Sequence, residues 1–255
     1  MKINQVAAQL YTARKHTQTP SDLADCLKKL RTIGYEVVQV SSLGPIEPKE
    51  LVKIASDAGV VICSLHDNSD EILNDPQKVA DRLSELGVDT TVYAHPDGID
   101  VSVPANVESL VKRLEHSGRV LHEAGKVLCY HNHSLEFIRH NDKQLVLEYI
   151  FDKIDPKYLQ SEIDTYWVQH GGCDPVDWML RLKNRAPIMH LKDYASAKGQ
   201  PVICEIGRGN LNFKKIIAAA ESSGCKWFAV EQDFPEDAFE SLKISFDYIK
   251  ENLVS

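Results

Sequence analysis

The chain has 255 residues, 43% of them hydrophobic, with 29 basic residues against 37 acidic ones and a formal net charge of -8. This composition is typical of a globular protein with one large core, and the acidic balance argues against a nucleic-acid partner. No apolar run approaches the roughly 18 residues of a membrane span, and no signal-peptide core follows Met1, so we expect a cytoplasmic protein with no membrane partner.

Short β-rich runs alternate with helical stretches from one end of the chain to the other. Eight runs are expected to form strands, at residues 3–10, 37–40, 60–65, 91–94, 127–130, 159–163, 188–191 and 227–230. They lack a clean alternation of apolar and polar residues, as expected for strands that are buried on both faces. Strands separated by helices must run parallel.

The helical stretches carry their own start and stop signals. The first helix is expected to begin after the N-cap Thr19, with Pro20 as its first residue, and to end at Gly34. Asp174 and Pro175 form the same start signal before a later helix. Further apolar stripes with helical spacing lie at residues 51–58, 79–86, 107–121, 144–154, 213–220 and 239–249.

Eight strand–helix units predict a (β/α)8 TIM barrel that forms one domain over residues 1–255. An open, doubly wound parallel sheet is the alternative fold. The first strand is not followed by a Gly-rich phosphate turn, which weakens a dinucleotide-binding version of that sheet. The six cysteines contain no C-x-x-C pair, so we interpret them as reduced thiols rather than a disulfide framework.

Acidic and imidazole side chains are concentrated where the expected strands end. In a TIM barrel those ends build the active site. Such groups repel or neutralise one another at a shared rim unless a divalent cation holds them. Mixed oxygen and nitrogen ligands suit Mn²⁺, Mg²⁺, Co²⁺ or Zn²⁺, and a closed structural zinc site would more often contain Cys. The candidate ligands, from strands five to eight, are Glu136, Asp164, His190 and Glu231.

Several motifs resemble those of the sugar phosphate isomerase/epimerase family, the xylose isomerase-like TIM barrels. The resemblance covers nearly the whole chain. Its motifs are Tyr130-His131-Asn132-His133 with Glu136-Phe137, Asp164-Thr165-Tyr166-Trp167 followed by Gly171-Gly172-Cys173-Asp174-Pro175, His190-Leu191-Lys192-Asp193, Glu205-Ile206-Gly207-Arg208-Gly209, and Val230-Glu231-Gln232-Asp233.

The resemblance implies a metal site made of Glu, Asp, His and Glu from the last four strands, which correspond to Glu136, Asp164, His190 and Glu231. Glu136 matches this pattern least well, since His131 and His133 lie as close to the end of the fifth strand. Ketose epimerases of the family commonly place a His three residues past the metal-binding Asp, where this chain has Trp167. That residue either stacks on a sugar face or packs structurally.

The implied reaction is isomerisation or epimerisation of a sugar, keto-sugar or polyol, with removal of a proton next to a carbonyl. The enediolate that forms is negative, and a chelated metal stabilises it. Glu136 and Glu231 are the natural pair of proton-transfer groups. The candidates for substrate binding are His66, His95, His131, His133, Trp167, Lys192 and Arg208.

Three other functions compete with this one. A lyase or dehydratase of the same barrel, of the inosose dehydratase or deglycosidase type, would use the same proton abstraction. An abasic-site endonuclease would need more His ligands and a basic surface, which the acidic composition disfavours. A barrel that binds sugars without turnover would be favoured by a missing ligand. The exact substrate, the preferred metal and any homo-oligomeric state are left open.

Overall fold

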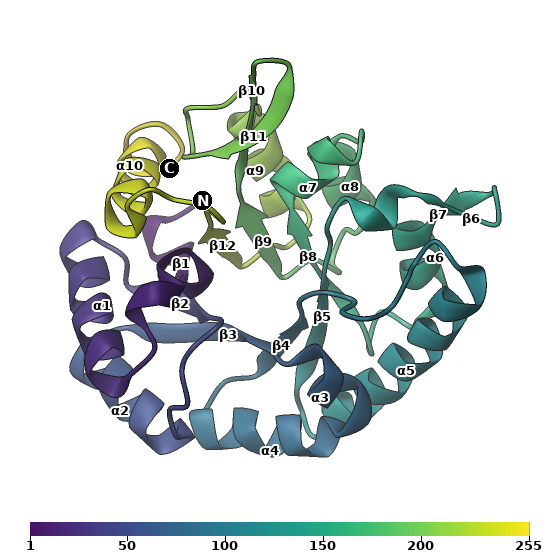
Figure 1. The fold of residues 1–255 in the computed structure, drawn as a ribbon, viewed down its shortest axis with the longest axis horizontal. Coiled ribbons are helices and arrows are strands. Elements are labelled where there is room, and N and C mark those ends of the chain that lie inside the picture. The colour runs from purple at the N-terminus through teal and green to yellow at the C-terminus, as the bar shows by residue number, and fades with distance from the viewer. Residues whose placement is uncertain (255) are drawn as a thin grey trace.

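The computed structural model describes residues 1–254 and contains eight parallel strands that close into a barrel (Figure 1). The strands pair around the barrel in the order β1-β12-β9-β8-β5-β4-β3-β2. Their bounds are β1 Val6–Gln9, β2 Val37–Val40, β3 Val61–Asp67, β4 Thr90–Tyr93, β5 Val127–His131, β8 Gln160–Asp164, β9 Ile188–Leu191 and β12 Trp227–Val230. The predicted (β/α)8 barrel is therefore confirmed, and closure excludes the open sheet.

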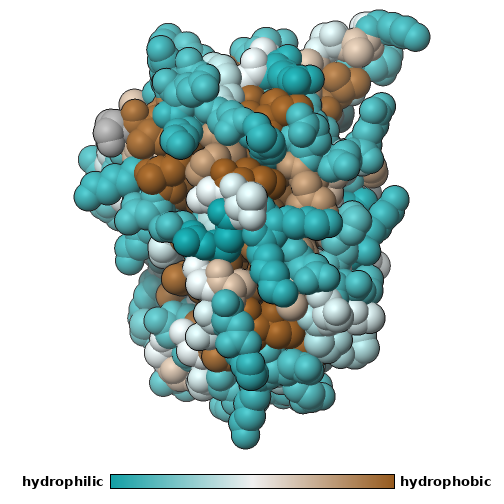
Figure 2. Space-filling view, turned by 90° about the vertical axis from the view of Figure 1, so that its left-hand side faces the viewer, coloured by the Kyte–Doolittle hydropathy of each residue, from teal (hydrophilic) through white to brown (hydrophobic). Residues whose placement is uncertain are grey.

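Helices surround the barrel and cover the outer face of the strands (Figure 1). Their bounds are α1 Pro20–Ile33, α2 Pro48–Asp57, α3 Ser69–Asn74, α4 Pro76–Leu86, α5 Pro104–Glu123, α6 Val146–Lys153, α7 Thr165–His170, α8 Pro175–Arg181, α9 Phe213–Ser222 and α10 Ala238–Asn252. No helix in residues 1–254 is long and apolar enough to cross a membrane. The face on the left of Figure 1 is mostly hydrophilic, with smaller hydrophobic areas (Figure 2).

The local signals in the sequence explain where the helices begin and end. The Thr19 side chain accepts a hydrogen bond from the backbone N–H of Asp22, and Pro20 is the first residue of α1. Gly34 ends the helix with a φ of 129°, a conformation that L side chains rarely adopt. Asp174 caps α8 in the same way, ahead of Pro175. The start and stop predicted for α1 and the start predicted for α8 are confirmed.

The structure differs from the prediction mainly at the C-terminal ends of the strands. The first strand begins only at Val6, because residues 3–5 form a 3-10 turn, η1 (Ile3–Gln5). A second 3-10 segment, η2 (Leu10–His16), follows it, and a third, η3 (Leu135–Phe137), follows β5. Two antiparallel hairpins are added, β6 (Arg139–His140) with β7 (Gln144–Leu145) and β10 (Asp193–Ala197) with β11 (Gln200–Cys204). These pieces are too short to show a periodicity of their own.

The β10–β11 hairpin leaves the barrel after β9 and returns through a loop that one carboxylate holds together. The side chain of Asp193 accepts hydrogen bonds from the backbone N–H groups of Tyr194, Gly207, Gly209 and Leu211 at 2.8 to 3.3 Å. The start of the hairpin is thus tied to the end of the loop that follows it. This makes the glycine-rich stretch at 205–209 part of a closed excursion from the barrel rim.

Gly118 of α5 marks a close approach between this helix and the chain just before β8. A Cβ atom at this position would collide with the backbone carbonyl of Tyr158. We expect Gly118→Ala to lower the free energy of unfolding by about 1–3 kcal/mol, because the helix must move away from the strand layer. Urea denaturation measures this, with His116→Ala on the exposed side of α5 as the control. Equal stability of both variants would contradict it.

Candidate functional site

The barrel axis contains a buried carboxylate, that of Glu162 on β8. Its Oε2 lies 2.6 Å from His66 Nε2, 3.0 Å from His131 Nδ1 and 3.0 Å from His190 Nε2. Its Oε1 accepts a hydrogen bond from the Gln39 side chain. All of these side chains come from strands of the barrel and project inward, and together they satisfy a charge that would be very costly to bury alone.

A second group lies one step nearer the strand ends. Asp164 follows Glu162 by two residues on β8, so both side chains face the barrel interior. Asp164 is paired in register with His190 of β9, and Glu231 follows the end of β12. One ligand atom from each of these three residues lies within 4.8 Å of the others, in a geometry that could hold a metal ion.

The two groups share His190, and His131 of the first group also contacts Asp164 of the second. Glu162 contacts Nδ1 of His131 and Nε2 of His190. The remaining nitrogens face outward: His131 Nε2 lies 4.0 Å from Asp164 Oδ2, and His190 Nδ1 lies 3.0 Å from Glu231 Oε2. A carboxylate behind a histidine that presents its other nitrogen is the usual support of a metal-binding imidazole.

Lys192 supplies positive charge to the same carboxylates. The side chain is buried, and its Nζ lies 3.1 Å from Asp164 Oδ2, 2.7 Å from Glu231 Oε2 and 2.9 Å from Asp233 Oδ1. Burial alone would favour the neutral amine, but the three carboxylates outweigh it and hold the pKa of Lys192 well above its usual value. The ammonium therefore stays charged in the site.

The pKa values of the other groups follow from burial and from their partners. Burial opposes the charge on His190, but Glu162 and Glu231 raise its pKa to about 10, so the ring carries protons at both nitrogens in the absence of metal. Burial lowers the pKa of His131 to about 3. Burial raises the pKa of Asp164 to about 6, and Lys192 limits the rise. Burial also opposes ionisation of Glu231, but Lys192 and His190 hold its pKa well below its usual value.

Glu231, Lys192 and His131 border a cavity at the barrel mouth with a volume of about 370 Å³. Its lining includes Tyr11, His66, His95, His131, His133, Lys192, Glu231 and Asp233. Two buried polar atoms near it, His133 Nδ1 and Trp167 Nε1, make no hydrogen bond within the described part of the chain. Buried polar groups are normally satisfied, so these atoms point to a bound partner.

Three of the four predicted metal ligands meet, and one does not. Asp164, His190 and Glu231 form the second group, whereas Glu136 belongs to neither group found in residues 1–254. Its carboxylate instead accepts hydrogen bonds from the Tyr130 hydroxyl at 2.9 Å and the His133 backbone N–H at 2.8 Å. The structure thus does not bring Glu136 together with the other three expected ligands, because in η3 its carboxylate is bound by Tyr130 and the His133 backbone.

The predicted substrate-binding residues divide in a similar way. His66, His95, His131, His133 and Lys192 line the mouth cavity. Trp167 is half-buried beside it, with its ring centroid 5.2 Å from that of His133 and 5.6 Å from Lys192 Nζ. Arg208 is exposed in the loop after β11 and does not line this cavity, so the structure does not bring it to the site.

Sequence reasoning missed Glu162 and Gln39, which organise the histidines. Both lie inside strands rather than at strand ends. A signal was present for Glu162: it lies within the predicted strand at 159–163, two residues before Asp164, and the period of a strand puts both on one face. No comparable signal marks Gln39, since a single amide in a short strand is compatible with either face.

A closed parallel (β/α)8 barrel with carboxylates and imidazoles gathered at the C-terminal ends of its strands defines a TIM-barrel protein with its candidate site at the barrel mouth. Residues 27–251 match the family described as the xylose isomerase-like TIM barrel. The match covers most of the chain, and the chain belongs to this family.

Individual relatives are more distant. Inosose dehydratase of Geobacillus kaustophilus (strain HTA426) is 23% identical over 189 residues, which cover 66% of this chain and 60% of that protein. A sugar phosphate isomerase/epimerase from Parabacteroides distasonis ATCC 8503 has a TM-score of 0.83 at 23% identity, over 98% of this chain and 95% of that one. A xylose isomerase-like protein from Mycobacterium smegmatis, solved with magnesium, has a TM-score of 0.78 at 14% identity, over 98% and 97%. These likenesses show the fold.

The position of Glu136 predicts how stability depends on pH. Burial raises the pKa of Glu136 to about 7 in the folded state. At pH values between the usual pKa of a Glu side chain and this raised pKa, the folded state binds more protons than the unfolded state. The neutral carboxyl contributes its full stabilisation at pH values below the pKa of Glu136 in the unfolded state. This contribution is lost as the pH rises through the pKa of Glu136 in the folded state. We expect the stability of Glu136→Gln relative to wild type to rise by about 1–3 kcal/mol from pH 5 to pH 8.

Urea denaturation at the two pH values measures this difference. Glu123→Gln, an exposed position near the end of α5, is the control and should show a constant difference. A constant difference for Glu136→Gln as well would show that this carboxyl does not change protonation on unfolding in this range.

Proposed function

We propose that this protein is a divalent-metal-dependent enzyme that acts on a sugar, keto-sugar or polyol by removing a proton next to a carbonyl, as an isomerase or epimerase. The observation that carries the proposal is the use of Glu162 as a common support. Glu162 contacts one ring nitrogen of His131 and one of His190. The other nitrogen of His131 faces Asp164, and that of His190 faces Glu231, at the edge of a cavity. The small-molecule substrate would enter from the mouth.

The residues present fit a divalent metal. Asp164 Oδ2 is buried and receives no hydrogen bond, although Lys192 Nζ lies 3.1 Å away. Asp164, His190 and Glu231 would hold the ion, with His131 as the adjoining fourth ligand, and the proton on His190 is the one a metal would displace. The oxygen and nitrogen donors suit Mn²⁺, Mg²⁺, Co²⁺ or Zn²⁺. When bound, the ion would stabilise negative charge that develops on substrate oxygens.

The side chains around this site can perform the proton transfer. Glu231 is ionised and reaches the cavity, so it is the candidate base. Lys192 donates to it and can also bind a substrate oxygen. His133, with its unpaired Nδ1, and Trp167, with its unpaired Nε1, are placed to bind or orient hydroxyl groups.

Elimination of water is the second candidate reaction. The likeness to an inosose dehydratase favours it, and so does the position of Glu136, because without that carboxylate Glu231 has no matching Glu on the opposite side of the mouth. One base and a nearby acid such as Lys192 are enough for elimination. Product analysis by NMR on a panel of keto-sugars and inososes separates the two reactions.

Metal content tests the proposed ligands directly. Wild-type protein reloaded with Mn²⁺ and dialysed should contain about one equivalent per chain, since the residues form one site. His190→Ala should lose most of this metal, because His190 belongs to both groups of side chains. His116→Ala on the exposed face of α5 should retain it. Full retention by His190→Ala would show the ligand assignment to be wrong.

The base is tested by isotope exchange. Glu231→Gln preserves the shape and one oxygen ligand but removes the acceptor for the proton, so exchange of the substrate α-proton in deuterated water should slow by about 10²-fold or more. NMR follows the exchange, and metal analysis of the same samples confirms that the ion is still bound. Glu236→Gln, exposed in the same loop, is the matched control. If Glu231→Gln exchanges at the wild-type rate, Glu231 is not the base.

A further inference from the structure

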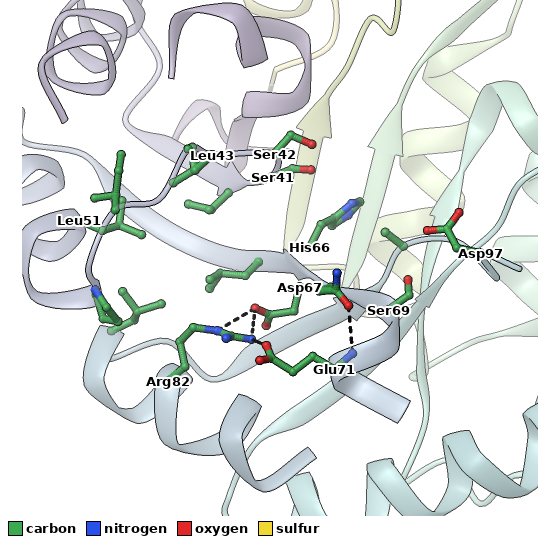
Figure 3. Close-up of a pocket in the computed structure, with 18 residues that line it drawn as sticks. Ser41, Ser42, Leu43, Leu51, His66, Asp67, Ser69, Glu71, Arg82 and Asp97 are labelled. Atoms are coloured by element: carbon green, nitrogen blue, oxygen red, sulfur yellow. Dashed lines mark hydrogen bonds and ion pairs between the residues drawn. The ribbon is translucent and has the colours of Figure 1, made fainter. Parts of the chain in front are cut away.

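A second cavity, here called the side cavity, adjoins the mouth between the ends of β2 and β3 (Figure 3). Its volume is about 530 Å³, larger than the 370 Å³ of the mouth cavity. The two cavities share lining residues, namely Ser41, Ser42, His66, Ala94 and Asp97. The two cavities therefore lie next to each other along these residues.

The lining of the side cavity combines apolar and hydroxyl-bearing surface. Its apolar part comes from Leu43, Ile46, Leu51, Leu65 and Leu86, and its polar part includes Ser41, Ser42, Asn68 and Ser69. A pyranose ring presents the same combination, with C–H groups on its faces and hydroxyls on its edge. Apolar side chains interspersed with hydrogen-bonding groups are typical of a small-molecule site.

The charges in the side cavity disfavour an anionic occupant, because Asp67, Glu71 and Asp97 outnumber Arg82 in its lining. Arg82 is the one basic residue in its lining, and its Nη2 lies 2.7 Å from Asp67 Oδ1 and 2.5 Å from Glu71 Oε2. Figure 3 shows Arg82 between these two carboxylates along the side opposite Ser41 and Ser42. Because two acids already pair with the guanidinium, it leaves no free positive charge for a phosphate group.

The loop after β2, at the shared edge of the two cavities, is held in place by contacts within the protein. Ser42 has a φ of 53°, a strained conformation for a residue other than Gly, at the shared edge. The Gln18 side chain donates to the backbone carbonyl of Ser42 at 3.0 Å, and Gly44 N–H donates to the carbonyl of Thr17 at 3.1 Å. A Cβ at Gly44 would collide with the Gln18 backbone, so the loop is packed tightly on the chain that follows β1.

We propose that the side cavity binds the second unit of a two-unit substrate, a glycoside whose keto-sugar occupies the mouth and whose neutral glycosyl group lies against Leu43 and Leu65. This inference rests on the proposed function for the placement of the keto-sugar. A substrate of one small ring would leave the larger of the two adjoining cavities unused.

Equilibrium binding tests this independently of turnover. The probes are a keto-glucose, oxidised at one ring carbon, prepared as its methyl glycoside and as the disaccharide with glucose as the second unit. Isothermal titration with Mn²⁺-loaded protein should give an affinity for the disaccharide about tenfold or more above that for the methyl glycoside, because only the disaccharide reaches the side cavity.

Two variants locate the second unit. Leu43 and Ile46 line the side cavity and not the mouth cavity, so Leu43→Trp and Ile46→Trp should each remove the preference for the disaccharide and leave methyl glycoside binding unchanged. Leu180→Trp, at a residue half-exposed on α8, is the control for the added indole. Circular dichroism checks that each variant is folded.

The outcomes separate this inference from the proposed reaction. A disaccharide preference that the two variants abolish supports the side cavity even if neither probe is turned over. Equal affinity for the two probes, binding of neither, or a preference that survives both variants would overturn it. Tight binding of a phenyl glycoside without tight binding of the disaccharide would also overturn it, since the second unit would then not be glycosyl.

Discussion

The charge of Glu162 in the middle of the barrel is the constraint on which the rest of the site depends. Removing an isolated carboxylate from water in such a position would cost many kcal/mol. The surrounding strands provide three imidazoles and an amide that contact the carboxylate and offset this cost. Each of these partners is thereby fixed in orientation. The ring of His190 cannot turn without breaking its contacts to both Glu162 and Glu231. The buried Glu162 therefore fixes the orientation of a side chain that contacts the groups at the strand ends.

Acidic, imidazole and ammonium groups are stacked along the barrel axis and contact one another. Glu162 lies deepest, the histidines lie around it, the carboxylates of Asp164 and Glu231 come next, and Lys192 lies among them. Every layer is stabilised by the one below it, which makes the site rigid without a bound ligand. Rigid placement of charged groups is what allows an enzyme to stabilise a developing charge without reorganising around it.

The sequence predicted the features that repeat and missed those that depend on one local turn. Strands buried on both faces and helices that begin at Pro and end at Gly specify the barrel, and the shared edge of parallel strands brings Asp164, His190 and Glu231 together. Glu136 lies five positions past the end of β5, where only the three-residue turn η3 decides whether it faces the mouth or Tyr130. The direction of the Glu136 side chain depends on its hydrogen bond to Tyr130, a contact that spacing along the chain does not reveal.

The closed excursion after β9 has a consequence for how such a protein can diverge. Asp193 joins the start of the β10–β11 hairpin to the loop at Gly207 and Gly209 through hydrogen bonds. Because these bonds close the segment at its base, residues inserted into or deleted from the hairpin change the segment itself and not the strands of the barrel. His190 and Lys192, only a few residues upstream, keep their positions. Descendants of one ancestral barrel could therefore exchange this segment for another of different length while keeping the same arrangement of His190 and Lys192.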